Sequence, residues 1–173
     1  MLPQINLRVA AILVAIIILL SLFSKLFAIL FLLIGVVIVS FIVNHFNLRI
    51  LGLELATFAT VITGIVYGAV IGAIVGVILV TIHLVLSGYF GRYYIWVIPE
   101  YGLAGYLASQ WASQNIITLG MSITLLLHGI NIFFSFLFRR HMLPSYLVYA
   151  ATNVVFNFFF FSLFGQFAIN VLS

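Results

Sequence analysis

The sequence predicts an all-α fold, a polytopic transmembrane helical bundle in which residues 1–173 form a single integral membrane domain. Three observations predict it: hydrophobic residues make up 66% of the chain, charged residues make up 5%, and the mean hydropathy is +1.43. In a water-soluble domain about a quarter of the residues are charged. Six basic and two acidic side chains are therefore too few to cover a soluble globule, and the lipid bilayer is the expected surroundings.

The apolar runs mark the individual spans. A helix needs about 20 apolar residues to cross the hydrocarbon core. Seven runs meet this requirement, at 7–24, 26–44, 48–66, 69–87, 94–112, 115–138 and 143–171. The alternative is six spans, if 94–112 is re-entrant or if residues 7–44 do not form two full spans. Either count predicts a multi-pass protein of the cell membrane.

Two breaks between these runs are of special interest. Ser24 and Lys25 separate the first two runs, and no signal-peptide cleavage site follows them, so the first run is interpreted as a retained helix. The stretch 50–87 is nearly twice too long for one span. It is expected to fold back at Tyr67 and Gly68.

The basic residues are scattered between apolar runs, which is typical of membrane-protein loops and excludes a patch for nucleic acid. With seven spans, five arginines fall on one side and Lys25 on the other. By the positive-inside rule the arginine side and the N-terminus are then cytoplasmic. The five arginines are Arg8, Arg49, Arg92, Arg139 and Arg140.

Small residues recur at helical spacing in two places. Gly64, Gly68, Gly72 and Gly76 are four residues apart, which lets a neighbouring helix approach closely. Their expected role is helix packing, divided between two helices by the break near Gly68. Ala11 and Ala15 form a second pair of this kind, although alanine is frequent enough there for chance to explain it.

Polar side chains are predicted to form one layer inside the membrane, near the arginine side. Glu54, His83 and Glu100 are expected at a similar depth, about 6–10 Å below that face. An ionisable group in lipid costs about 2.5–3.5 kcal/mol or more unless it faces a partner or a wet cavity. The layer therefore forms either a ligand pocket or a set of interhelical hydrogen bonds. The deeper candidates for it are His128, Asn131, Asn153 and Asn157.

Aromatic residues crowd around Arg92, at Tyr89, Phe90, Tyr93, Tyr94 and Trp96. They are interpreted either as an interfacial belt or as a stacking lid for a planar ligand. Signatures of enzymes are missing, including the phosphate loop, the Gly-x-Ser-x-Gly elbow and the His-Glu-x-x-His zinc motif. We expect no catalytic activity, no cofactor and no metal site.

The stretch from Leu53 to Gly76 resembles the substrate-binding (S) components of energy-coupling-factor (ECF) vitamin transporters, and more loosely the MreD rod-shape proteins. Gly68, Gly72 and Gly76 match the glycines of a turn-and-helix motif in these families, with Ala69 at the usual proline position. The resemblance implies a vitamin-like ligand, a transmembrane coupling subunit and cytoplasmic ATPases as partners. Asn153 matches an Asn often seen in the last helix of S components, and Ala11 and Ala15 are similar to the small-residue motif by which their first helix contacts the coupling subunit.

Two functions follow as expectations. The first is a membrane subunit that binds a small molecule in a half-membrane pocket, and the second is an MreD-like scaffolding subunit without a ligand. The resemblance also implies that the glycine turn faces the cytoplasm and the pocket faces outward. This orientation is opposite to the one that the loop charges predict.

Overall fold

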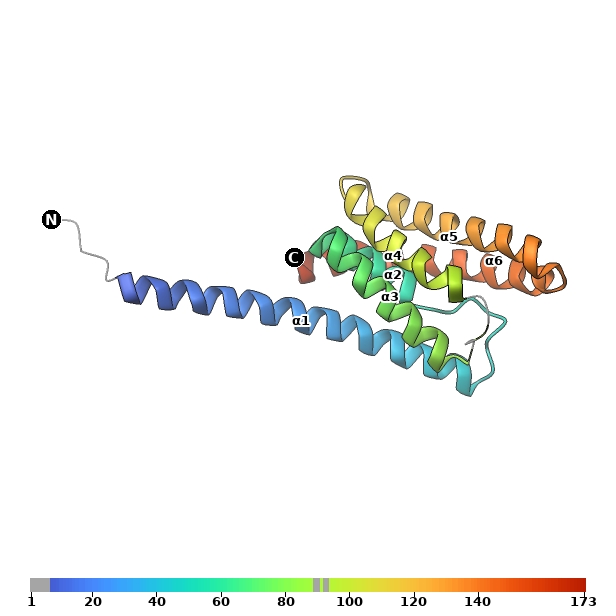
Figure 1. Cartoon of the computed structure of the whole chain (residues 1–173), viewed down its shortest axis with the longest axis horizontal. Helices are drawn as coiled ribbons and strands as arrows, with labels where there is room; N and C mark the ends of the chain where they lie inside the picture. The colour runs from blue at the N-terminus through green and yellow to red at the C-terminus, as the bar shows by residue number, and fades with distance from the viewer. Residues whose placement is uncertain (1–6, 89–90, 92–93) are drawn as a thin grey trace.

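The computed structural model describes residues 7–88, 91 and 94–173. These residues form helices and contain no β-strand. Figure 1 shows one long helix followed by a bundle of shorter ones. The helices are α1 (Leu7–His45), α2 (Ala56–Tyr67), α3 (Ala69–Leu86), α4 (Tyr94–Gln110), α5 (Ile116–Phe138), the 3₁₀ turn η1 (Arg140–Met142), α6 (Leu143–Phe160), the π-helical turn η2 (Phe161–Gly165) and α7 (Gln166–Leu172).

Helix α1 is continuous, so the prediction of two spans at 7–24 and 26–44 is wrong. Its 39 residues extend about 58 Å at 1.5 Å per residue. Neither Ser24 nor Lys25 ends a helix, because both residues are compatible with helical backbone, and neither glycine nor proline occurs from Leu7 to Ile34. The polar pair is a break in hydropathy and not a turn.

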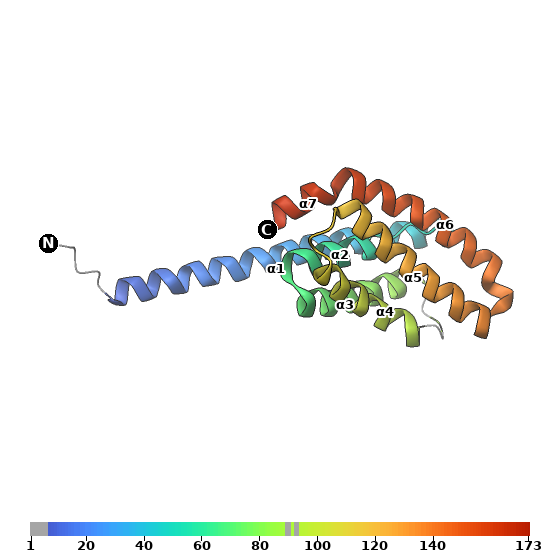
Figure 2. The same ribbon diagram turned by 90° about the horizontal axis from the view of Figure 1, so that it is seen from above.

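Only the C-terminal half of α1 packs against the other helices (Figures 1 and 2). Its buried side chains recur every three or four residues, so they form one face that lies mainly on α3. They are Ala28, Leu32, Val36, Ser40 and Val43. At the other end of this face the ammonium of Lys25 lies 5.9 Å from the centre of the Tyr67 ring. The N-terminal half extends past the bundle. Arg8 is in the first turn of α1 and Arg49 follows its last residue, so a whole helix separates the two arginines that the charge count assigned to one side.

Four helices among the described residues are long and apolar enough to cross a membrane, at Phe23–His45, Ala69–Leu86, Ile116–Phe138 and Arg140–Leu172. Most of the expected boundaries from residue 69 onward agree with the structure within a few residues. The expected span 48–66 is wrong at its start, since helix begins only at Ala56. Residues 46–55 instead form a non-helical segment, which we call the α1–α2 segment.

Helix α2 lies at the centre of the bundle and contacts α1, α3, α4, α5, α6 and α7. Nine of its 12 residues are buried, so it has little surface left for lipid and needs no full membrane-spanning length. It ends at Tyr67, where the chain folds back as predicted. Gly68 connects it to α3 with φ +89° and ψ 173°, a backbone conformation that residues other than glycine rarely adopt.

Glycines bring α2, α3 and α4 into close contact. A Cβ on Gly64 or Gly72 would overlap the backbone of Gly105 on α4, and one on Gly76 would overlap the carbonyl oxygen of Tyr101. Gly68 has no atom near its missing Cβ, so its role is the turn. The predicted role in helix packing is therefore confirmed for Gly64, Gly72 and Gly76 and not for Gly68.

The last two helices continue each other through the π-helical turn, which widens the helix by one residue. This turn directs the fully buried ring of Phe161 onto the backbone of Gly120 on α5, where a Cβ would lie 2.5 Å from the ring. The expected final span 143–171 is thereby present as α6, η2 and α7.

Candidate functional site

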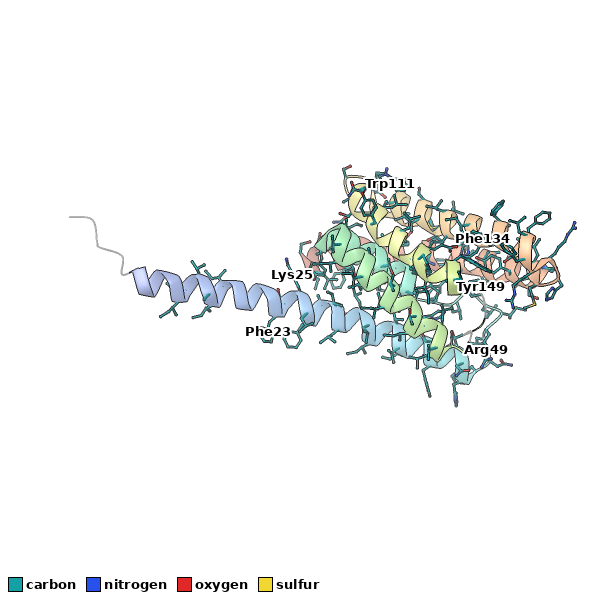
Figure 3. The ribbon with its side chains drawn as sticks, in the orientation of Figure 1. Phe23, Lys25, Arg49, Trp111, Phe134 and Tyr149 are labelled. Atoms are coloured by element: carbon teal, nitrogen blue, oxygen red, sulfur yellow. The ribbon has the colours of Figure 1, made fainter. Side chains whose placement is uncertain are left out.

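A partly open cavity of about 380 Å³ lies at the end of the bundle opposite the Gly68 turn, between the α1–α2 segment and helices α2 to α6. Figure 3 shows Arg49 and Tyr149 at this end, and Lys25 and Trp111 toward the other. Exposed residues mark its mouth, and buried ones its inner end. The lining residues used below are Arg49, Thr57, His83, Trp96, Tyr101, Thr124, His128, Asn131, Ser135, Arg139, Tyr146, Tyr149 and Asn153.

Glu54 lies behind the inner wall of this cavity and holds the wall together. The sequence predicted Glu54 within the span 48–66, but it lies before the first residue of α2. One carboxylate oxygen accepts the backbone N–H of Thr57 at 2.9 Å, which suits the positive end of the helix dipole. The other accepts the Thr57 hydroxyl at 2.5 Å and the Asn153 amide at 3.2 Å, with the Tyr101 hydroxyl at 3.4 Å. The carboxylate therefore binds three lining residues instead of facing the cavity.

Asn153 joins this group to α5. Its amide nitrogen donates to the carbonyl of Gly52 at 2.7 Å, and since a carbonyl can only accept, this bond fixes the orientation of the amide. The amide oxygen then faces His128 Nε2 at 2.8 Å, so Nε2 must carry the proton. In the neutral imidazole, Nδ1 of His128 is then the acceptor for the Tyr146 hydroxyl at 2.9 Å.

Glu100 lies behind a second part of the wall, formed by Asn131. The Asn131 amide donates to Glu100 Oε2 at 2.5 Å and to the carbonyl of Leu127 at 2.9 Å. Its oxygen accepts the indole N–H of Trp96 at 3.1 Å. Glu100 is 6% exposed, and its Oε1 is buried with no hydrogen-bond partner among the described residues.

His83 lines the cavity from α3 and is also bonded to α1. The hydroxyl of Ser40 donates to the carbonyl of Val36 at 2.6 Å, so it accepts from His83 Nδ1 at 2.8 Å. Nδ1 therefore carries the proton in this contact. The bond ties the packed half of α1 to the wall of the cavity.

The structure places the predicted site residues in two groups. His83, His128, Asn131 and Asn153 line the cavity, whereas the expectation that Glu54 and Glu100 line it is wrong. Asn157 lies one turn behind, where its amide donates to the oxygen of Asn153 at 2.9 Å. Sequence spacing places a residue on a face of its own helix. It does not predict which side chains of neighbouring helices separate the carboxylates of Glu54 and Glu100 from the cavity.

Helix periodicity correctly placed Thr124, His128, Asn131 and Ser135 on one face, and all four line the cavity. The sequence reasoning missed Tyr146 and Tyr149, although they precede Asn153 by seven and four residues on the same face of α6. It also missed Tyr101, whose hydroxyl contacts that of Thr57 at 3.0 Å.

Aromatic rings make up much of the apolar lining. Tyr146 and Tyr149 are stacked with centroids 5.8 Å apart, and Trp96 is stacked on Phe134 at 5.2 Å. Of the aromatic residues predicted near Arg92, Trp96 thus lines the cavity. Tyr89, Phe90, Tyr93 and Arg92 itself lie outside the described residues, as does the side chain of Tyr94.

No family model, no curated protein and no solved structure matches this chain. The function is therefore argued from the cavity itself. Within the described residues, no three side chains of metal-ligating type lie together. The helix-packing pair Ala11 and Ala15 is remote from the cavity, on the part of α1 that extends past the bundle. Ala15 is exposed there, and the side chain of Ala11 lies outside the described residues.

Proposed function

We propose that this chain is the small-molecule-binding subunit of an ECF-type transporter, similar to an S component, that captures a vitamin-like solute in the cavity. The observation that carries the proposal is the cavity of about 380 Å³ among helices of a membrane bundle. Ligand sites typically measure about 300–1,000 Å³ and combine apolar and aromatic walls with a few polar groups. Trp96, Tyr101 and Tyr146 supply such walls, and His83 and Asn131 supply polar groups.

The proposed membrane topology has six spans. From Lys25 to His45, α1 rises about 30 Å, which matches the thickness of the hydrocarbon core. Helices α2 to α5 and the α6–α7 rod supply the other five spans. The short α2 fits this arrangement because other helices surround it. The protein is then a multi-pass protein of the cell membrane.

The proposed partners are a transmembrane coupling subunit and cytoplasmic ATPases. The sequence contains no phosphate-binding loop, so energy for transport would come from other subunits. In this proposal the cavity binds the solute and catalyses no reaction, because the side chains of His128 and Asn153 are engaged in hydrogen bonds within the wall.

The experiment asks whether the purified protein carries a small molecule in this cavity. Ser135→Trp places a large ring in the cavity from a half-buried position, and Leu137→Trp puts the same ring on the exposed side of α5. Compounds released by heat from each protein are identified by mass spectrometry. The wild-type protein and Leu137→Trp should release the same compound, and Ser135→Trp should lose it. Equal release from all three, or none from the wild type, contradicts the proposal.

A scaffolding subunit, as in MreD-like proteins, is the second candidate. The observation that favours it is the apolar half of α1 that extends past the bundle, with Ile12, Val14 and Ile17 more than half exposed. A scaffold would bury this surface against another membrane protein and would carry no ligand. It therefore predicts that no compound is released by any of the three proteins.

A further inference from the structure

The hydrogen-bond donors at the inner end of the cavity already end on protein acceptors. The amide of Asn153, Nε2 of His128 and the hydroxyl of Thr57 donate within the wall network described above. The hydroxyl of Thr124 donates to the carbonyl of Gly120 at 2.8 Å. A charged group of a ligand needs donors or counter-charges to replace its water. The inner end therefore does not stabilise an anion.

The acidic residues strengthen this conclusion. Glu54 and Glu100 are the only acids in the sequence, and both lie behind the cavity wall. Glu54 directly contacts Thr57, Tyr101 and Asn153, which line the inner end. A ligand anion placed there would lie near this carboxylate, in surroundings of low dielectric constant where repulsion is strong. What the inner end offers is a set of aromatic faces suited to an uncharged planar group.

The mouth of the cavity has the opposite character. Arg49 on the α1–α2 segment and Arg139 after α5 both line it. A guanidinium presents five N–H donors and is always charged. Arg49 uses one of its nitrogens to donate to the side chain of Asn44. One such bond does not use all five donors of the guanidinium, and Arg139 brings a second charge to the same opening.

We infer that the ligand is an amphipathic organic anion, with a planar apolar body among the aromatic residues and a carboxylate or phosphate held at the mouth by Arg49 and Arg139. This inference rests on the proposed function and names the chemical class of the solute. It also sets the direction of binding, because the uncharged end enters first. The positive mouth would attract such an anion from solution before the body is buried.

The test compares three probes with the same bicyclic ring: naphthoate, naphthamide and naphthylmethylammonium. Each is titrated by calorimetry into the full chain in nanodiscs of phosphatidylcholine. Naphthoate should bind about tenfold tighter than naphthamide, the gain expected from one charge-assisted hydrogen bond. In the double variant Arg49→Gln/Arg139→Gln this preference should disappear. Arg140→Gln, next to the cavity but not lining it, should keep the preference.

The naphthamide affinity shows that the cavity itself is intact in the double variant. Tighter binding of the cationic probe, equal affinities for all three, or a preference that survives in the double variant would overturn the inference. Nanodiscs that also contain phosphatidylglycerol identify the source of the anion. Unchanged naphthoate binding supports a soluble ligand, whereas displacement assigns the mouth to an anionic lipid and overturns it.

The inference and the proposed function fail in different ways. If only the inference is wrong, the probes still bind but without the expected charge preference. If the proposed function is wrong, the probes do not bind, and the wild-type protein releases either no compound or one that Ser135→Trp releases equally, which overturns both.

Discussion

The backbone of Gly52 lies directly against Asn153 on α6. The carbonyl of Gly52 accepts the Asn153 amide at 2.7 Å, and its N–H donates to the hydroxyl of Thr152 at 2.8 Å. A Cβ on Gly52 would overlap the Cβ of Asn153 and the carbonyl oxygen of Tyr149. The α1–α2 segment, which carries Arg49 to the mouth of the cavity, is therefore held on α6 at this point.

Gly52→Ala should destabilise the protein by about 1–3 kcal/mol, because the added methyl group meets backbone that cannot move aside. The segment should also move away from α6, so affinity for the ligand or for naphthoate should fall. Thermal unfolding and calorimetric titration in nanodiscs measure the two effects. Gly129→Ala is the matched control, since nothing lies within 4 Å of the added Cβ and alanine is the better helix former. Equal stability of the two variants would contradict the close contact.

Glu54→Gln should lower stability by about 1–3 kcal/mol even though the side chains have the same size. Glu54 accepts from Thr57, Tyr101 and Asn153, and the amide nitrogen of Gln would direct a donor at one of these donors. Unfolding midpoints of the variant and the wild type measure the loss. Gln166→Ala, which removes an exposed side chain that donates to Asn170, should stay within about 0.5 kcal/mol of the wild type. A wild-type midpoint for Glu54→Gln would show that the carboxylate does not hold the wall.

Gly105→Ala should destabilise the contact between α3 and α4 by about 3 kcal/mol, at the upper end for overpacking. Its Cβ would overlap the carbonyl of Gly72, and neither backbone can yield without separating the helices. Thermal unfolding is the measurement, again against Gly129→Ala. Since Gly105 does not line the cavity, the naphthoate-to-naphthamide affinity ratio of the folded fraction should be unchanged. A stable Gly105→Ala protein would exclude this helix contact.

Single cysteines test the topology, because the natural chain has none. In the six-span arrangement, cysteines at Asn47 and His141 should react with an impermeant maleimide from one side of the membrane, and one at Gln114 from the other. A cysteine at Arg8 tests whether α1 crosses the membrane once, as its continuous helix implies. With six spans it lies on the Gln114 side, whereas seven spans place it with Asn47. Labelling in right-side-out and inverted vesicles gives the assignment and also the orientation, on which the loop charges and the family resemblance disagree.

The sequence by itself determined the features that depend on local chemistry. Apolar runs of sufficient length specify helices in lipid, since every backbone polar group must be satisfied there. Gly68 ends α2 in a backbone conformation that other residues rarely adopt. Thr124, His128, Asn131 and Ser135 share a face because a helix has 3.6 residues per turn.

Tertiary structure decided what hydropathy does not distinguish. Residues 48–55 are apolar enough to extend a helix, yet Thr152 and Asn153 on α6 bind their backbone in a non-helical form. Lys25 marks a polar position without ending α1, because one charged residue does not disrupt helical hydrogen bonding. Glu54 and Glu100 lie in polar positions that the sequence predicts, but which way they face depends on Asn153 and Asn131, their neighbours across the bundle. Composition and period are properties of one segment, whereas the walls of a cavity are set by contacts between segments that are distant in sequence.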